Sequence, residues 1–268
     1  MNHLLRDLAP ISDEAWALID EEARRSLKHY LAARRLVAFS GPLGWPTSAV
    51  DLGRVVRLPA GPGPGVDAAR RRVLALVELR IPFSLRRDEL EDAERGAQDL
   101  DLNPVIDASR VAALAEDHAI FNGYGEGGIT GIVPSSPHEP VTINDDYSAY
   151  PTRVAKAVET LRSADVGGPY SIAMGTRCYT GVIETTEHGG YPVFEHLRQI
   201  LGGSVVWAPA VDGAIVLSER GGDYEMTVGE DFSIGYRSAS EESVAFYLEE
   251  SLAFAINTPE AAVALKYR

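Results

Sequence analysis

The sequence has little cysteine, no long apolar run and few positive charges relative to negative ones. Its single cysteine, Cys178, excludes an internal disulfide bond and a metal site built from several cysteines. The longest apolar runs are about five residues, as at 111–115, which is too short to span a bilayer. The N-terminus carries charges where a signal peptide needs an apolar core. These absences predict a cytoplasmic protein.

The charge balance is strongly acidic. Among 268 residues, Lys and Arg number 25 and Asp and Glu number 39, so the net charge is −14. Such a surface repels nucleic acid and anionic lipid, and we expect neither as a partner. Apolar residues make up 45% of the chain, enough for a globular core, which excludes a wholly disordered chain.

Catalytic motifs are also missing. Neither G-x-S-x-G nor H-E-x-x-H occurs in the sequence. Cys178 is a nucleophile only beside a histidine base, and a free cysteine is more often a small buried residue. The pairs at 187–188 and 195–196 suggest a metal cluster, but Gly189, Gly190 and Pro192 break any helix between them. We therefore predict no catalytic residues, no metal and no cofactor.

A letter-for-letter match to G-x-G-x-x-G occurs at 123–128. In a nucleotide-binding fold, this motif follows a strand and opens a helix. Here a predicted helix precedes the motif and a Pro/Ser-rich loop follows it. The segment is interpreted as a flexible linker.

Residues 12–33 are predicted to form one amphipathic helix that begins at Ser12, a favourable N-cap. Its apolar stripe consists of Trp16, Ile19, Ala23, Leu27 and Leu31. Two interpretations stay open: the stripe packs only on the core of its own domain, or it also lines a groove for a partner peptide.

Residues 49–58 and 70–81 have the pattern of two long hairpin strands, joined by a Gly/Pro-rich tip at 59–65. A two-stranded ribbon is marginally stable in isolation. We therefore expect an arm that is covered by another subunit. The other predicted elements are helices at 84–96, 103–122, 151–164, 176–185 and 192–201, strands at 170–174, 204–208, 214–218, 224–228 and 244–256, and a subdomain boundary within 123–140.

Several blocks, in order along the chain, resemble the encapsulin (linocin-like) shell proteins of bacterial nanocompartments, family 1. They are Leu8-Ala-Pro10, Gly41-Pro-Leu-Gly-Trp45, Pro82-Phe-Ser-Leu85, 88–96, 116–123, 168–172, 207–236 and 247–254. The resemblance implies an α+β chain with the HK97-like phage capsid fold. It assigns residues 1–45 to an N-terminal arm, 46–81 to the extended loop, 82–132 and 221–268 to a peripheral domain with a spine helix, and 133–220 to an axial domain.

The resemblance also implies a function. Such subunits self-assemble into an icosahedral shell, most often a 60-mer, that encloses a cargo enzyme and admits small solutes through pores. The cargo is typically a peroxidase or a ferritin-like protein, active in oxidative stress or iron storage, and carries a C-terminal targeting peptide. The shell itself is not an enzyme. The alternatives are the coat protein of a defective phage, or a hydrolase or bacteriocin using Cys178 or residues 184–196.

Two sites follow from the same resemblance. The groove for the cargo peptide is assigned to Leu27, Leu31, Arg34, Leu36, Tyr247, Leu252 and Phe254. In this assignment Arg34 donates hydrogen bonds to peptide carbonyls, and the alternative is a solvated arginine at the helix end.

The five-fold pore loop is assigned to Glu184, Glu187, His188, Gly189, Gly190 and Tyr191. A ring of acidic groups favours cations. This chain has two glycines, Gly189 and Gly190, between the histidine and the tyrosine, where relatives usually have one. The extra residue lengthens or loosens the loop. Asp88 occupies the place of a tryptophan that stacks on flavin in some relatives, so no flavin is expected.

Overall fold

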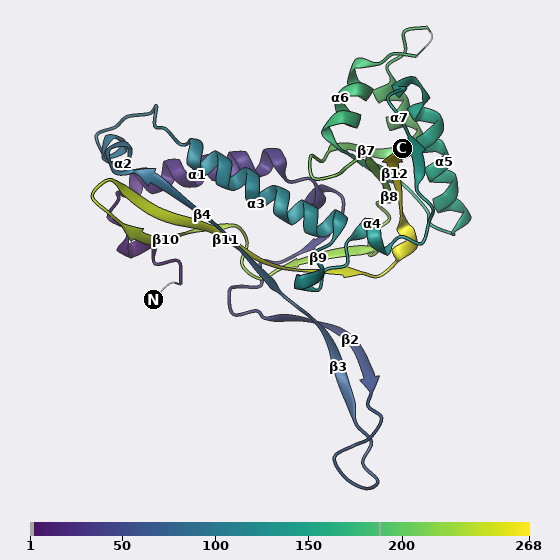
Figure 1. Ribbon diagram of the computed structural model, residues 1–268, viewed down its shortest axis with the longest axis horizontal. Helices are drawn as coiled ribbons and strands as arrows, with labels where there is room; N and C mark the ends of the chain where they lie inside the picture. The colour runs from purple at the N-terminus through teal and green to yellow at the C-terminus, as the bar shows by residue number, and fades with distance from the viewer. Residues whose placement is uncertain (1–2, 188) are drawn as a thin grey trace.

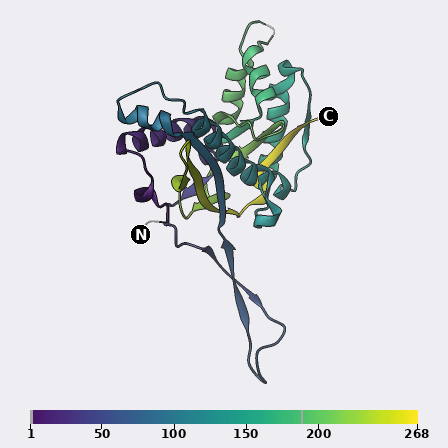
Figure 2. The ribbon, with the colours of Figure 1, turned by 60° about the vertical axis from the view of Figure 1, so that its left-hand side comes forward.

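The structure, a computed structural model, describes residues 3–187 and 189–268 (Figures 1 and 2). Its first sheet has the order β1-β9-β11-β10, and β4 pairs antiparallel with β11 from Ser243↔Arg86 to Leu252↔Val77. The strands are β1 (Ala38–Ser40), β4 (Val77–Arg86), β9 (Tyr224–Val228), β10 (Ser233–Ala239) and β11 (Ser243–Ile256). Alternating apolar residues make β11 the longest strand, and it is almost wholly buried.

Two long helices pack against this sheet, α1 (Asp13–Tyr30) and α3 (Asn103–Asn122), with the short α2 (Arg87–Glu94) at one end (Figure 1). The Ser12 hydroxyl caps α1 by accepting a hydrogen bond from the Ala15 amide at 3.2 Å. The α1 stripe meets an aromatic cluster on the sheet, where Trp16 lies edge-on to Phe246 with 5.3 Å between ring centroids.

The second sheet has the order β5-β12-β8-β6-β7 and carries helices α5 (Tyr150–Ser163), α6 (Thr176–Glu184) and α7 (Val193–Leu201). Its strands are β5 (Val141–Ile143), β6 (Tyr170–Met174), β7 (Gly202–Trp207), β8 (Ala214–Ser218) and β12 (Ala262–Tyr267). Every residue of β6 and β8 is buried, as in central strands with both faces covered.

A two-stranded arm projects away from both sheets (Figures 1 and 2). It consists of β2 (Ala49–Arg57) and β3 (Ala69–Ala75), which pair antiparallel. Neither strand has a single buried residue, and Val55, Val56 and Val73 are among the most exposed large apolar side chains. The arm therefore has no core of its own.

The second predicted arm strand and the following helix are wrong in their boundaries. The arm ends at Ala75, and residues from Val77 belong to β4 in the first sheet. The helix predicted at 84–96 begins only at Arg87, because Phe83 and Leu85 continue the alternation of β4 and face the core. Charge density was misleading here, and strand periodicity was the better signal.

The interpretation of 123–128 as a flexible linker is also wrong. After α3, the Tyr124 and Ile129 backbones exchange hydrogen bonds around a 3₁₀ turn, η3 (Gly125–Gly127), and a short helix, α4 (Ile132–Ser135), follows. Gly123 has φ +91°, and a Cβ there would lie 2.3 Å from the Thr130 carbonyl oxygen. This glycine permits a tight backbone approach.

The first helix is shorter than predicted. α1 ends at Tyr30 and a separate 3₁₀ turn, η2 (Ala33–Arg35), follows it. The Asp117 carboxylate on α3 accepts hydrogen bonds from the Ala32 amide at 3.0 Å and the Ala33 amide at 2.8 Å. A tertiary contact therefore ends the helix.

Candidate functional site

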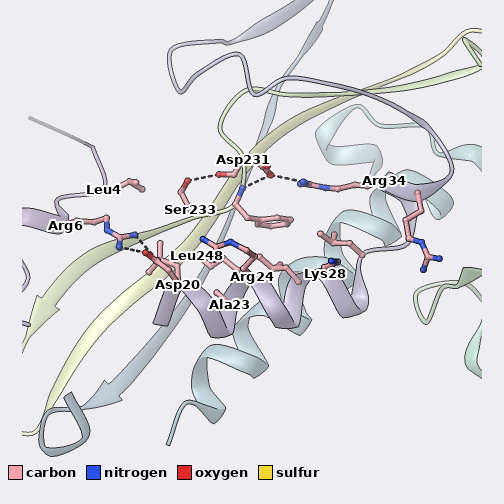
Figure 3. Close-up of a pocket in the computed structure, with 15 residues that line it drawn as sticks. Leu4, Arg6, Asp20, Ala23, Arg24, Lys28, Arg34, Asp231, Ser233 and Leu248 are labelled. Carbon is pink, nitrogen blue, oxygen red and sulfur yellow. Dashed lines mark hydrogen bonds and ion pairs between the residues drawn. The ribbon is translucent and has the colours of Figure 1, made fainter. Parts of the chain in front are cut away.

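A groove of about 790 Å³ lies between α1 and the paired strands β10 and β11 (Figure 3). Its apolar lining consists of Leu4, Ala23, Leu27, Leu31, Phe232, Ile234 and Leu248. Ile234 and Leu248 are cross-strand partners and almost fully buried, so they form a floor that the sheet holds in place. A fixed apolar floor between a helix and a sheet suits an extended apolar peptide.

Charged side chains surround this apolar floor. Arg24, Lys28 and Arg35 line the groove and make no ion pair with the residues that the structure describes. Arg6 forms two hydrogen bonds to Asp20 at the opposite end, at 3.0 and 2.6 Å (Figure 3). The edge is therefore polar although the floor is apolar.

The structure brings some of the predicted groove residues together and separates others. Leu27, Leu31 and Arg34 line the groove, whereas Leu36 is buried in the core beneath the second sheet. On β11 the side chain that lines the groove is Leu248, next to the predicted Tyr247.

Three predicted β11 residues lie elsewhere. Tyr247 lies beneath the Arg80 guanidinium, 4.4 Å from it, and donates a hydrogen bond to the His3 carbonyl. Leu252 and Phe254 pair with β9, beyond the groove, and belong to the core of the second sheet. Successive strand residues face opposite sides, so a shift of one residue along β11 moves a side chain to the other face.

The Arg34 guanidinium is neither solvated nor free to donate hydrogen bonds to peptide carbonyls. Its guanidinium hydrogen-bonds to Glu116 at 2.7–3.1 Å, to Asp231 at 2.8 Å and to Glu250. The Glu116 and Glu250 side chains are fully buried, and the Arg34 side chain is 17% exposed. Each of the three guanidinium nitrogens donates to at least one carboxylate, so Arg34 fastens η2 to α3 and β11.

The predicted pore loop joins α6 to α7 and lies on the opposite side of the molecule from the arm (Figures 1 and 2). The Glu187 amide donates to the Tyr191 carbonyl at 2.8 Å, and the Gly190 amide donates to the Glu187 carbonyl at 2.9 Å. Gly189 and Gly190 have φ +105° and +82°. The two glycines thus make the turn of a small hairpin.

The side chains of this loop turn back onto α7. Glu187 Oε1 lies 2.9 Å from His196 Nδ1, and the Tyr191 hydroxyl accepts a hydrogen bond from Gln199 at 2.8 Å. Glu184 is exposed at the end of α6. His188 lies outside the described residues. The described part of the loop therefore offers Glu184 to solvent, while Glu187 is paired within its own subunit.

The remaining candidates are structural in their contacts. Cys178 is fully buried, and its Sγ lies 3.3 Å from the Tyr150 hydroxyl and 3.2 Å from the Tyr267 hydroxyl. Asp88, the position discussed for flavin, pairs with Arg86 at the surface. Across the described ranges, no group of three or more His, Cys, Asp or Glu side chains is arranged to hold a metal ion. Likewise, none of the helices in those ranges is long and apolar enough to cross a membrane.

Residues 1–253 match the protein family described as "Encapsulating protein for peroxidase". The chain belongs to the encapsulin shell protein family. It is similar over 99% of its length to the type 1 encapsulin shell protein of Rhodospirillum rubrum, at 49% identity and covering 97% of that protein. It is 45% identical to the type 1 encapsulin shell protein of Mycobacterium tuberculosis, with 100% of both chains covered.

Solved structures agree on the fold. The virus-like particle of Pyrococcus furiosus aligns with a TM-score of 0.63 at 17% identity, covering 95% of this chain and 98% of the other. Microbacterium phage Oxtober96 aligns with a TM-score of 0.61 at 11% identity, covering 89% and 91%. The encapsulin chain therefore has the HK97-like phage capsid fold, as predicted. Its membership of the encapsulin family gives it the predicted role of a self-assembling shell.

The residues of the encapsulin groove that sequence reasoning missed come from β10, from the turn before it and from β11. They are Ile234 on β10, Phe232 in the preceding turn and Leu248 on β11, and residues 229–243 carried no predicted strand. The signal that could have revealed β10 was alternation. Ile234 and Tyr236 are separated by one glycine, and a polar segment follows them.

Proposed function

We propose that sixty copies of this chain close into an icosahedral nanocompartment in the cytoplasm, which encloses a cargo enzyme. The main support for this proposal is the exposed arm formed by β2 and β3. β2 and β3 have nine and seven residues and bury none of them, so their exposed valines need a second surface. A neighbouring subunit supplies that surface in a closed shell, where each arm is covered by the next copy.

The groove beside α1 is the proposed docking site for a C-terminal peptide of the cargo. Its apolar lining includes Leu27, Leu31, Ile234 and Leu248. Cargo of the peroxidase or ferritin-like class fits the family to which the chain belongs. In this proposal Arg34 stabilises the groove wall by pairing with the carboxylates of Glu116, Asp231 and Glu250, and it does not pair with peptide carbonyls.

Substitution in the groove tests this proposal. Leu31→Glu places a charge on the half-buried lining without opening the core, so shells should form but carry little cargo. The matched control is Val111→Glu on α3, where the side chain is 51% exposed and outside the groove. Each variant is co-expressed with a candidate cargo of the peroxidase or ferritin-like class, and the purified shells are analysed for cargo. Equal amounts of cargo in the two variants would exclude the groove as the docking site.

The α6–α7 loop is the proposed boundary of a five-fold pore. Glu184 is exposed beside it, and five copies would form an acidic ring that attracts cations. Glu187 contributes through its pair with His196, which holds the hairpin against α7.

A flux measurement tests the pore. Shells loaded with a fluorescent protein are mixed with a cationic or an anionic quencher, and the rates of quenching are compared. Glu184→Gln should slow quenching by the cationic quencher and should not slow quenching by the anionic one, whereas replacement of Glu159, an exposed glutamate on α5, by Gln should change neither rate. Identical rates for wild type and Glu184→Gln would place the entry route elsewhere.

A further inference from the structure

Buried carboxylates outnumber cations where η2 meets α3 and β11. Among the residues that the structure describes, Arg34 is the single cation here, and it faces Glu116 on α3, Glu250 on β11 and Asp231 in the turn between β9 and β10. Glu116 and Glu250 are fully buried, whereas Asp231 is 42% exposed. Two ionised carboxylates beside one buried guanidinium leave an excess negative charge that water does not screen.

Two observations indicate that Glu250 holds a proton. Its Oε1 contacts Arg34, and its side chain also hydrogen-bonds to the Glu116 carboxyl, a contact between two carboxyl groups that needs a proton on one of them. Burial, together with the nearby charge of Glu116, raises the pKa of Glu250 well above its usual value. A neutral Glu250 leaves Arg34 to balance Glu116.

Asp117 adds a further titrating group next to the cluster. Burial raises its pKa to about 7, although the Ala33 and Ala32 amides hydrogen-bond to its carboxylate. The charged groups that act on Glu250 are Arg34, Glu116 and Asp231, and Glu250 also lines a cavity of about 250 Å³ with Glu78, Glu230 and Glu249. On the opposite side of β11, Glu249 is paired with Arg80 at 2.6 Å.

We propose that Arg34, Glu116 and Glu250 form a proton-linked latch that fastens the η2 turn to α3 and β11. With Glu250 protonated, the latch is closed. When Glu250 ionises, the guanidinium faces two buried carboxylates, and the turn detaches from the sheet. Arg34 also lines the groove, so the latch controls one end of the groove wall. The latch itself does not depend on what the groove binds.

The direction in which stability changes with pH follows from the difference between the pKa values of a group in the folded and unfolded chain. A carboxyl group whose pKa is raised on folding binds a proton in the folded state that the unfolded chain has already released. Its contribution to stability is therefore lost as pH rises from the usual value of the carboxyl to the raised pKa. For Asp117 this range extends from about 4 to about 7, and for Glu250 it ends well above its usual value.

Hydrogen exchange on assembled shells tests the latch. The amides of Arg35, Leu36 and Val37 donate within the turn, to Ala32 and Ala33 carbonyls. Their protection factors, corrected for intrinsic exchange, should fall at least about tenfold between about pH 6 and pH 9. Strand β8 is buried throughout and serves as the internal reference, with no such fall.

Glu250→Gln mimics the protonated side chain and should abolish the fall. Its melting temperature should equal that of wild type near pH 5 and exceed it by several degrees near pH 9. Glu159→Gln should follow the wild-type curve at every pH. Constant protection in wild-type shells, parallel melting curves, or a Glu250→Gln chain that does not fold at neutral pH would each overturn the proposal.

Discussion

Replacement of Arg34 by alanine is the most informative change in this chain, because it separates a structural role from peptide recognition. The change removes the only cation between Glu116 and Glu250, whose side chains are fully buried. Removal of one partner from a buried ion pair costs about 3–5 kcal/mol. Since Glu250 is already protonated near neutral pH, only Glu116 is left as an unpaired buried charge, and we expect the lower end, about 3 kcal/mol.

For a chain of this length, such a loss lowers the melting temperature by roughly 10 °C. Differential scanning calorimetry of purified shells measures the change, and the loss should grow as pH rises, since both glutamates then ionise. Arg25→Ala is the matched control, because that guanidinium pairs with Glu22 at the surface and is 71% exposed. It should leave the melting temperature unchanged.

The opposite result is equally clear. An Arg34→Ala shell that melts like wild type but no longer retains cargo would mean that Arg34 binds the peptide. It would also mean that the pairing of Arg34 with Glu116, Asp231 and Glu250 does not stabilise the fold. Near pH 9, where both glutamates ionise, addition of Glu250→Gln to Arg34→Ala should recover part of the lost stability, because one of the two unpaired carboxylates is then replaced by a neutral amide; near pH 5, where Glu250 is already protonated, it should recover none. No recovery would refute the electrostatic argument even if the single change destabilised the shell.

Three further outcomes are expected. Replacement of 50–74, which contain the exposed valines of β2 and β3, by a two-residue Asn-Gly turn between the paired Ala49 and Ala75 should leave the subunit folded but prevent shell closure, and intact particles in electron micrographs would contradict the role of the arm. Gly123→Ala should destabilise the chain by about 1–3 kcal/mol in denaturant titrations, since its Cβ meets the Thr130 carbonyl at 2.3 Å, whereas Gly125→Ala has open space and should not. Cys178 is fully buried, so a thiol reagent should label it only after unfolding, and rapid labelling of native shells would reopen a role as a nucleophile.

Local pattern was sufficient for much of the fold. Ser12 and the stripe that follows it predicted α1, Asn103-Pro104 marked the start of α3, and alternating apolar residues predicted β11. The ribbon with the Gly/Pro tip was also readable, because β-strand period and turn residues are properties of adjacent positions. These elements, with the ordered family-like blocks, were enough to predict the capsid fold and the shell function.

Contacts between distant segments decided the rest. The end of α1 depends on Asp117, which lies 85 residues beyond Ala32, and β4 could be separated from the arm only by its pairing with β11. The groove likewise uses Leu248 rather than Tyr247, since register against β10 determines which face each residue of β11 occupies. Arg34 was identified in the sequence, but its role was not: three acids from three separate elements surround it. A sequence states which groups are present, whereas only the folded chain determines which of them share a low-dielectric interior, and that shared interior sets their charge.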